Sequence, residues 1–288
     1  MLLTVCGGGT YHAAMAEVHR PHLILVDSHA HLDDPKLAAE EGEVLRRAGE
    51  AGVAHVVAVG ADVASSRRAV EIARRVPQVS ATVGVHPHDA ATVTEGDWQG
   101  LRSLAASGRV VAVGECGLDF FRDLSPRDVQ RAVFARHLAM ARELGLPVVV
   151  HCRDAYEECL SILQSELATP IRGVLHCFQG DAAVARRALD LGLHLGIGGM
   201  LTFPREEALR GVVRRLPLGR LLVETDAPYL TPRPKRGRNE PAYVRLVAEC
   251  LAQVLGVSVG EVAEATTANA RQVFRLPGLS PSGSREGA

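Results

Sequence analysis

Eight short runs of apolar residues, rich in valine and leucine, recur along the chain from residue 23 onward. They begin near residues 23, 54, 80, 110, 147, 173, 194 and 221. Segments between them carry apolar residues at helical spacing, as in 62–76 and in 126–144, where Ser125 is the expected N-cap and Pro126 the first helical residue. This alternation predicts parallel strands that are joined by crossover helices.

The number of these units determines the predicted architecture. Eight strands, each followed by a helix, in about 250 residues favour a single-domain (β/α)₈ TIM barrel over an open doubly wound sheet. No GxGxxG motif follows the first run, which also disfavours the doubly wound alternative. We expect the barrel to span residues 23–276 and to end with two helices near 241–255 and 258–274. Residues 1–22 and 277–288 have neither periodicity, so we expect a mobile extension and a disordered tail there.

The charge and cysteine content disfavour some classes of protein. The 32 basic and 33 acidic side chains give a net charge of −1, which argues against coating of duplex DNA by a broad cationic face. The six cysteines form no CxxC pair, so the sequence favours a reducing, cytoplasmic compartment. No apolar run reaches the roughly 20 residues of a membrane span, and no feature indicates a membrane or an obligate protein partner.

Polar residues stand at the carboxyl ends of five predicted strands. His29 and His31 end the first, and the others are Glu115, His151, His176 and Asp226. In a TIM barrel these strand ends meet at one mouth, so we expect the six side chains to converge. Because strand side chains alternate in direction, both histidines of the HxH pair point to the same side.

Four imidazoles and two carboxylates exceed the needs of one tetrahedral centre, so the sequence predicts two divalent cations. A shared carboxylate would hold them about 4 Å apart. Such donors accept Zn²⁺, Mn²⁺ or Fe²⁺ readily and Mg²⁺ less readily, and the sequence selects none of them. The two lysines, Lys36 and Lys235, lie outside the predicted strands, so a carboxylated lysine is excluded as the bridge and Glu115 is the candidate.

These residues lie in motifs that resemble the TatD family of metal-dependent deoxyribonucleases across residues 23–275. The motifs are 27-DSHAHLD, 84-GVHPH, 113-VGECGLDFFRD, 147-PVVVHCRDA, 174-VLHCFQG, 222-LVETDAPYLTP and 237-GRNEP. The resemblance implies an amidohydrolase-type barrel that hydrolyses phosphodiesters and trims DNA from the 3′ end. Cys116 departs from the family, where a bulkier aliphatic residue is common, and residues 1–22 have no family counterpart.

The resemblance also implies how the ligands divide. It places His29, His31, Glu115 and Asp226 on one metal, and Glu115, His151 and His176 on the other. Our hypothesis makes Glu115 and Asp226 the catalytic residues. Asp226 orients the metal-activated water and accepts its proton.

Substrate phosphates require further cations. The segment 231-TPRPKRGRNEP supplies several, of which we select Arg236, and Arg153 follows His151 by two residues. We expect His86 in the GVHPH motif to contact a substrate phosphate or to support the ligands, rather than to bind a metal, because the six ligands already complete two sites. Phe178, Phe203 and Tyr229 are candidates for stacking on unpaired bases, with ordinary packing as the alternative for each.

The sequence therefore predicts a metal-dependent phosphodiester hydrolase, a 3′-5′ exonuclease acting on single-stranded DNA ends. Two enzymatic alternatives use the same metal site: a small-molecule amidohydrolase or esterase, and an aminoacyl-tRNA deacylase. A non-catalytic nucleic-acid-binding barrel with structural metal is a third, disfavoured because structural zinc sites are normally closed by four ligands.

Overall fold

Eight parallel strands form one sheet whose spatial order follows the sequence, in a computed structural model that describes residues 23–276 and residue 278. A parallel bridge between Ala30 and Ala227 brings the last strand back to the first, and His31 N donates to Ala227 O at 2.8 Å. The predicted single-domain TIM barrel is thus confirmed. The strands are β1 (Leu25–Ala30), β2 (Val53–Ala58), β3 (Val79–Val83), β4 (Val110–Asp119), β5 (Val148–Arg153), β6 (Gly173–Leu175), β7 (His194–Ile197) and β8 (Leu221–Val223).

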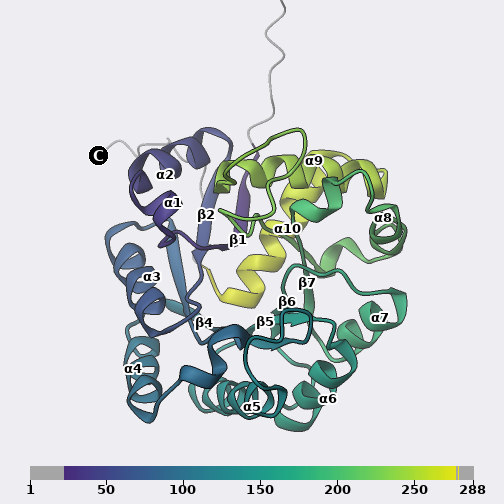
Figure 1. Cartoon of the computed structure of the whole chain (residues 1–288). Helices are drawn as coiled ribbons and strands as arrows, with labels where there is room; N and C mark the ends of the chain where they lie inside the picture. The colour runs from purple at the N-terminus through teal and green to yellow at the C-terminus, as the bar shows by residue number, and fades with distance from the viewer. Residues whose placement is uncertain (1–22, 277, 279–288) are drawn as a thin grey trace, which may run out of the picture.

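Helices surround the strands (Figure 1). The α-helices are α1 (Pro35–Ala38), α2 (Glu41–Glu50), α3 (Val63–Arg75), α4 (Glu95–Ala105), α5 (Arg127–Leu144), α6 (Tyr156–Glu166), α7 (Ala182–Asp190), α8 (Glu207–Val213), α9 (Val244–Leu255) and α10 (Val259–Phe274). Four 3₁₀ turns complete the described elements: η1 (Pro87–Thr92), η2 (Gly199–Thr202), η3 (Leu218–Arg220) and η4 (Pro241–Tyr243). The two helices expected at the end of the barrel are α9 and α10.

The predicted start of α5 is wrong by one residue. Pro126 has φ −53° and ψ 138°, so it precedes the helix as its N-cap rather than opening it. The Ser125 hydroxyl does not cap the helix; it donates to His88 O at 2.7 Å and accepts from Ala91 N at 3.0 Å. Ser125 therefore ties the loop after β4 to the turn η1 that follows β3.

The amino-terminal end of the barrel is closed by α10. Barrel residues such as Val26, Val149 and Leu222 are buried in one cluster with Val273 and Phe274 of this helix. Figure 1 shows α10 crossing the middle of the ring of strands. Its side chains also bond to strand ends, as when Thr267 Oγ1 donates to the carbonyl of Ile24 at 2.8 Å. The carboxyl-terminal mouth is left for the polar residues.

Within the described residues, no single helix is both long and apolar enough to cross a membrane. Two consecutive segments, Pro241–Leu255 and Val259–Phe274, reach that length and composition together, with a bend of 112° between them. Residues 1–22 and most of the tail after 276, for which we predicted an extension and disorder, lie outside the described residues.

Candidate metal centre

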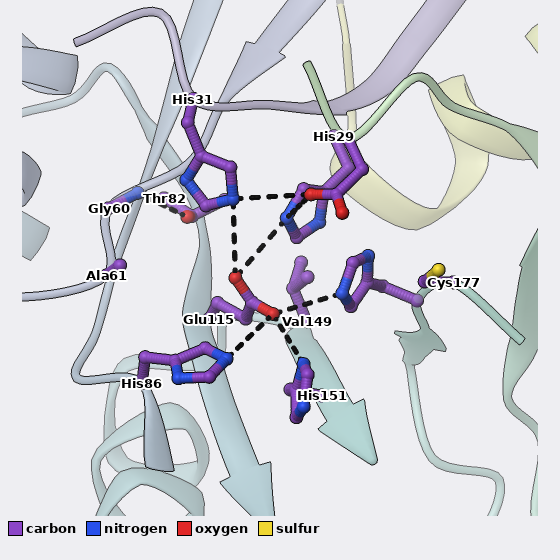
Figure 2. Close-up of polar contacts among 12 residues, drawn as sticks. His29, His31, Gly60, Ala61, Thr82, His86, Glu115, Val149, His151 and Cys177 are labelled. Atoms are coloured by element: carbon purple, nitrogen blue, oxygen red, sulfur yellow. Dashed lines mark hydrogen bonds and ion pairs between the residues drawn. The ribbon is translucent and has the colours of Figure 1, made fainter. Parts of the chain in front are cut away.

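Glu115 lies at the centre of the mouth, and its two carboxylate oxygens face different side chains (Figure 2). Oε2 lies 3.4 Å from His29 Nε2 and 3.6 Å from His31 Nε2. Asp226 Oδ1 completes this side, 3.7 Å and 3.4 Å from the same two nitrogens. These four predicted ligands meet around one end of the Glu115 carboxylate.

The other oxygen of Glu115, Oε1, faces three more imidazoles. It lies 2.9 Å from His151 Nδ1 and 3.0 Å from His176 Nε2. His86 Nε2 approaches the same oxygen at 3.6 Å. The structure thus brings the other five predicted ligands together around Glu115, and His86, predicted to support the ligands or to contact a phosphate, lies beside the same carboxylate.

Two glycines position Glu115. Gly114 and Gly117 have φ values of 143° and 144°, a region that disfavours other residues. A Cβ at Gly114 would lie 2.3 Å from Val149 O, and one at Gly117 only 1.9 Å from His151 O. The pairing of β4 with β5 shifts register between Val113 and Cys116. The glycines therefore permit an irregular, closely packed strand from which Glu115 reaches the centre.

Backbone hydrogen bonds join the HxH pair to Asp226. Because β8 ends at Val223, Asp226 lies just beyond the strand, and its N–H donates to His29 O at 2.9 Å. The buried Asp27 carboxylate accepts from Thr225 N at 2.9 Å and from Thr225 Oγ1 at 2.6 Å. These bonds hold the chain after β8 against the end of β1, so three ligands share one backbone framework.

Two further carboxylates orient the imidazoles on the Oε1 side, and we had not predicted either as a site residue. Asp119 Oδ2 lies 3.0 Å from His151 Nε2. Glu224 Oε1 lies 3.2 Å from His176 Nδ1 and accepts from Cys177 N at 2.5 Å. Both stand within four residues of a predicted ligand in the GECGLD and ETD motifs, which was the available signal. Such partners fix the tautomer and orientation of a metal-binding histidine.

The ionisable side chains around Glu115 shift one another's pKa values. Burial raises the pKa of Glu115, but the surrounding imidazoles, of which the charge of His176 is the largest opposing cause, hold that pKa well below its usual value. Burial lowers the pKa of His31, yet hydrogen bonding to Asp226 and the charge of Glu115 raise it to about 9. Burial and the neighbouring His151 hold the pKa of His86 well below its usual value. Glu115 is therefore an anion at neutral pH, and His86 is a neutral imidazole.

His29 gives the most direct test of whether a cation fits. Its side chain is fully buried, and neither ring nitrogen has a hydrogen-bond partner among the described residues. Its Nε2 faces carboxylate oxygens at 3.4 Å and 3.7 Å. Donors about 2.0–2.2 Å from a tetrahedral ion are spaced about 3.4 Å apart, so this side has the spacing of metal ligands.

The donor groups support the same conclusion. Among the residues that the structure describes, three sets have donor atoms that all lie within 4.8 Å of one another: His29, His31 and Asp226; His29, His176 and Glu224; and His86, Glu115 and His151. Imidazoles and carboxylates together suit divalent transition metals. The residues present therefore fit a metal centre that is built on Glu115.

The two predicted arginine contacts differ in their relation to this centre. Arg153 ends β5, two residues beyond His151, whereas the cavity that Arg236 lines contains none of the six predicted ligands. The Arg153 guanidinium lies 3.8 Å from the ring centroid of Phe121, and no carboxylate among the described residues pairs with it. Arg236 lines a cavity of about 680 Å³ together with Phe203 and Arg233. These two arginines remain available for an anionic ligand.

Two of the side chains in the segments considered for substrate binding, those of Phe178 and Arg238, are engaged in contacts within the protein. Phe178 is only 2% exposed, so its candidacy for base stacking is wrong; the side chain packs in the core instead. Arg238 of the basic segment is tied to Glu40 at 3.0 Å and to Lys36 O at 2.6 Å. Tyr229, by contrast, is 47% exposed.

Comparison with known proteins places this geometry in context. The sequence profile described as TatD related DNase matches residues 26–275. The chain is 42% identical over 254 residues to "Uncharacterized metal-dependent hydrolase YabD" of Bacillus subtilis, which covers 88% of this chain and 100% of that protein. It is 39% identical over 264 residues to "3'-5' ssDNA/RNA exonuclease TatD" of Erwinia tasmaniensis, with 88% and 100% covered. The crystal structure of YJJV, a TatD homolog from Escherichia coli, matches with a TM-score of 0.85 and 30% identity, covering 89% and 100%.

Proposed function

Because the chain belongs to the TatD family of metal-dependent hydrolases, we propose that it is a 3′-5′ exonuclease that hydrolyses phosphodiester bonds at single-stranded DNA ends. The observation that carries this proposal is the position of Glu115, whose two oxygens face two separate sets of donors. Two adjacent cation sites suit hydrolysis of a phosphodiester. The printed name of the Erwinia tasmaniensis relative supports the choice of substrate.

We assign the donors to two divalent cations, of zinc, manganese or magnesium. His29, His31, Asp226 and Glu115 Oε2 would hold one, and His151, His176 and Glu115 Oε1 the other. When bound, such cations lower the pKa of water and offset the negative charge on phosphoryl oxygens. Glu115 thus acts by keeping the two sites adjacent.

Asp226 is the proposed acceptor of the proton of the attacking water. Burial raises the pKa of Asp226, but the hydrogen bond with His31 and the charges of His176 and His29 lower it below its usual value. The carboxylate is therefore ionised at neutral pH, as a general base requires. Its side chain is 15% exposed, so the mouth leaves it accessible to water.

Three residues are proposed to bind the substrate. Arg153 and Arg236 are exposed, and their planar guanidinium groups match phosphate oxygens. His86 is 13% exposed and neutral, so it is available to hydrogen-bond a phosphate oxygen beside Glu115. We further propose a cytoplasmic location, consistent with free thiols at all five described cysteines.

The test is an end-labelled single-stranded oligonucleotide incubated with the purified holoenzyme, with and without EDTA. We expect a ladder shortened from the 3′ end, and its loss on chelation. Absence of cleavage with Mg²⁺, Mn²⁺ and Zn²⁺ each supplied would contradict the proposal and favour small-molecule or aminoacyl-tRNA substrates.

A further inference from the structure

Exposed apolar side chains are concentrated at the mouth of the barrel. In the described part of the chain, four large hydrophobic residues are exposed: Phe121 at 57%, Leu124 at 65%, Leu144 at 38% and Tyr229 at 47%. Phe121 and Leu124 follow β4, and Tyr229 follows β8, so three of the four lie on loops at the carboxyl ends of strands. Leu144 ends α5, where the chain returns to the opposite end of the barrel. Exposed aromatic rings beside a polar site indicate a binding surface.

Phe121 is connected to the Oε1 side of the metal centre. Its N–H donates to Asp119 Oδ1 at 3.1 Å, while Asp119 Oδ2 contacts His151 Nε2 at 3.0 Å. The Arg153 guanidinium lies 3.8 Å from the Phe121 ring centroid. Asp119 and Arg153 are partners in the pairing of β4 with β5, so both loops present this aromatic–cation pair together.

Tyr229 has the matching position on the Oε2 side. Its ring centroid lies 5.9 Å from that of His31, at an interplanar angle of 68°. Its hydroxyl donates to Asp34 Oδ2 at 2.8 Å, which fixes the ring at the rim. Lys36 Nζ lies 5.4 Å from the ring centroid. An exposed ring and a cation are therefore held together here too.

We propose that Phe121 with Arg153, and Tyr229 with Lys36, are two stacking platforms that bind unpaired nucleobases on the two sides of the scissile phosphate. Proteins that bind single strands combine aromatic rings, on which bases stack, with cations that track the backbone. The two pairs adjoin opposite ends of the Glu115 carboxylate, through His151 and through His31. A strand bound on both platforms would pass over Glu115 between them.

This inference rests on the proposed nuclease function and refines its substrate. A base that is paired within a duplex cannot leave its stack to lie on a protein ring without unpairing. The platforms therefore select the ends of strands with at least two unpaired nucleotides. The platforms also supply local affinity for the nucleic acid strand. The overall electrostatic field of a chain with a net charge of −1 does not provide that affinity.

The test compares F121A and Y229A with L144A, which truncates an exposed apolar side chain at the other end of the barrel. With the holoenzyme and a single-stranded oligonucleotide, we expect each platform variant to raise KM about tenfold and to change kcat less than about twofold. L144A should leave both parameters within about twofold. The aromatic replacements F121W and Y229F should restore most of the affinity, and circular dichroism checks folding.

Abasic nucleotides placed singly at the last, second and third positions from the 3′ end identify the bases involved. For each platform variant, the tenfold difference from wild type should shrink below about twofold when its own base is removed. The positions should differ between F121A and Y229A.

The inference would be overturned if both platform variants had wild-type KM values. It would also be overturned if the difference in KM between a variant and wild type were the same for every abasic oligonucleotide. Failure of the wild-type holoenzyme to cleave any oligonucleotide would be seen before any variant is compared. That result would refute the proposed function, and the platforms with it.

Discussion

The two ends of the Glu115 carboxylate differ in how their histidines are held. On the Oε1 side, His151 and His176 make contacts of 2.9 and 3.0 Å to Glu115 and are also bonded to Asp119 and Glu224. On the Oε2 side, the distances from His29 and His31 to the carboxylates run from 3.4 to 3.7 Å. We call the Oε1 side, with His151 and His176, the locked half of the metal centre. We call the Oε2 side, with His29 and His31, the open half.

The difference indicates what a cation contributes on each side. In the locked half, neighbouring carboxylates already fix the orientation of His151 and His176. In the open half, the buried His29 has no hydrogen-bond partner among the described residues. A buried polar group without a partner is costly, so a cation bound there would satisfy it. We therefore expect the order of the open half to depend on metal more than that of the locked half.

The largest effect is expected for Asp226→Asn in the open half. The amide is a poor metal ligand and cannot accept the proton of water, so we expect activity on single-stranded DNA to fall about 10³-fold or more. Oligonucleotide hydrolysis measures the loss, and circular dichroism should report an unchanged fold. The exposed Asp190→Asn on α7 is the matched control and should cleave as wild type does. A near-normal rate for D226N would remove Asp226 from the mechanism.

The Glu224→Gln variant tests the locked half, because Glu224 orients the imidazole of the proposed ligand His176. The neutral amide is a weaker acceptor for His176 Nδ1–H, so we expect metal affinity to fall about 10–100-fold. Competition with a fluorescent chelator measures the affinity. Supplying excess metal should restore much of the activity of E224Q, which it should not do for D226N. Unchanged metal affinity would show that the second carboxylate is dispensable.

Removal of the metal should affect the two halves unequally. Each cation held at about 100 times its Kd adds about 2.7 kcal/mol to the stability, so chelation of both should lower Tm by about 10–20 °C. Hydrogen exchange of the chelated protein should increase most in residues 28–31 and 225–231, and less in 148–153 and 173–177. An equal increase in both halves would contradict the distinction between them.

The smallest expected effect is the release of protons when a cation binds to the open half. Because the pKa of His31 is raised to about 9, its imidazole is protonated at neutral pH in the metal-free protein and must lose that proton to bind a cation. Metal affinity should therefore rise with pH up to about 9, and binding at pH 7.5 should release protons. Calorimetry in two buffers of different ionisation enthalpy measures that release. Identical heats in both buffers would contradict this account of the open half.

Much of the fold could be predicted because it depends on periodicity. Eight apolar runs with helical segments between them correspond to β1 through β8, and the strand ends locate the six proposed ligands. The HxH spacing placed His29 and His31 on one side because strand side chains alternate. The two closing helices were also predicted, and the structure shows that Ser258 and Glu261 form a capping box at the start of α10.

The packing of individual side chains could not be predicted from the sequence. Periodicity reveals neither the register shift between β4 and β5 around Glu115 nor the approach of His86 Nε2 to Glu115 Oε1 at 3.6 Å. It likewise gave no means of separating Phe178, which is buried in the core, from the exposed Phe121 and Tyr229. Each of these outcomes depends on contacts between residues that are distant in the chain.

Metal stoichiometry tests the central claim most directly, because that claim is that Glu115 joins two cation sites. Elemental analysis of the holoenzyme, saturated with Zn²⁺ or Mn²⁺ and then freed of unbound metal, counts the ions per chain. We predict about two per chain. Saturation at one ion per chain would contradict the account.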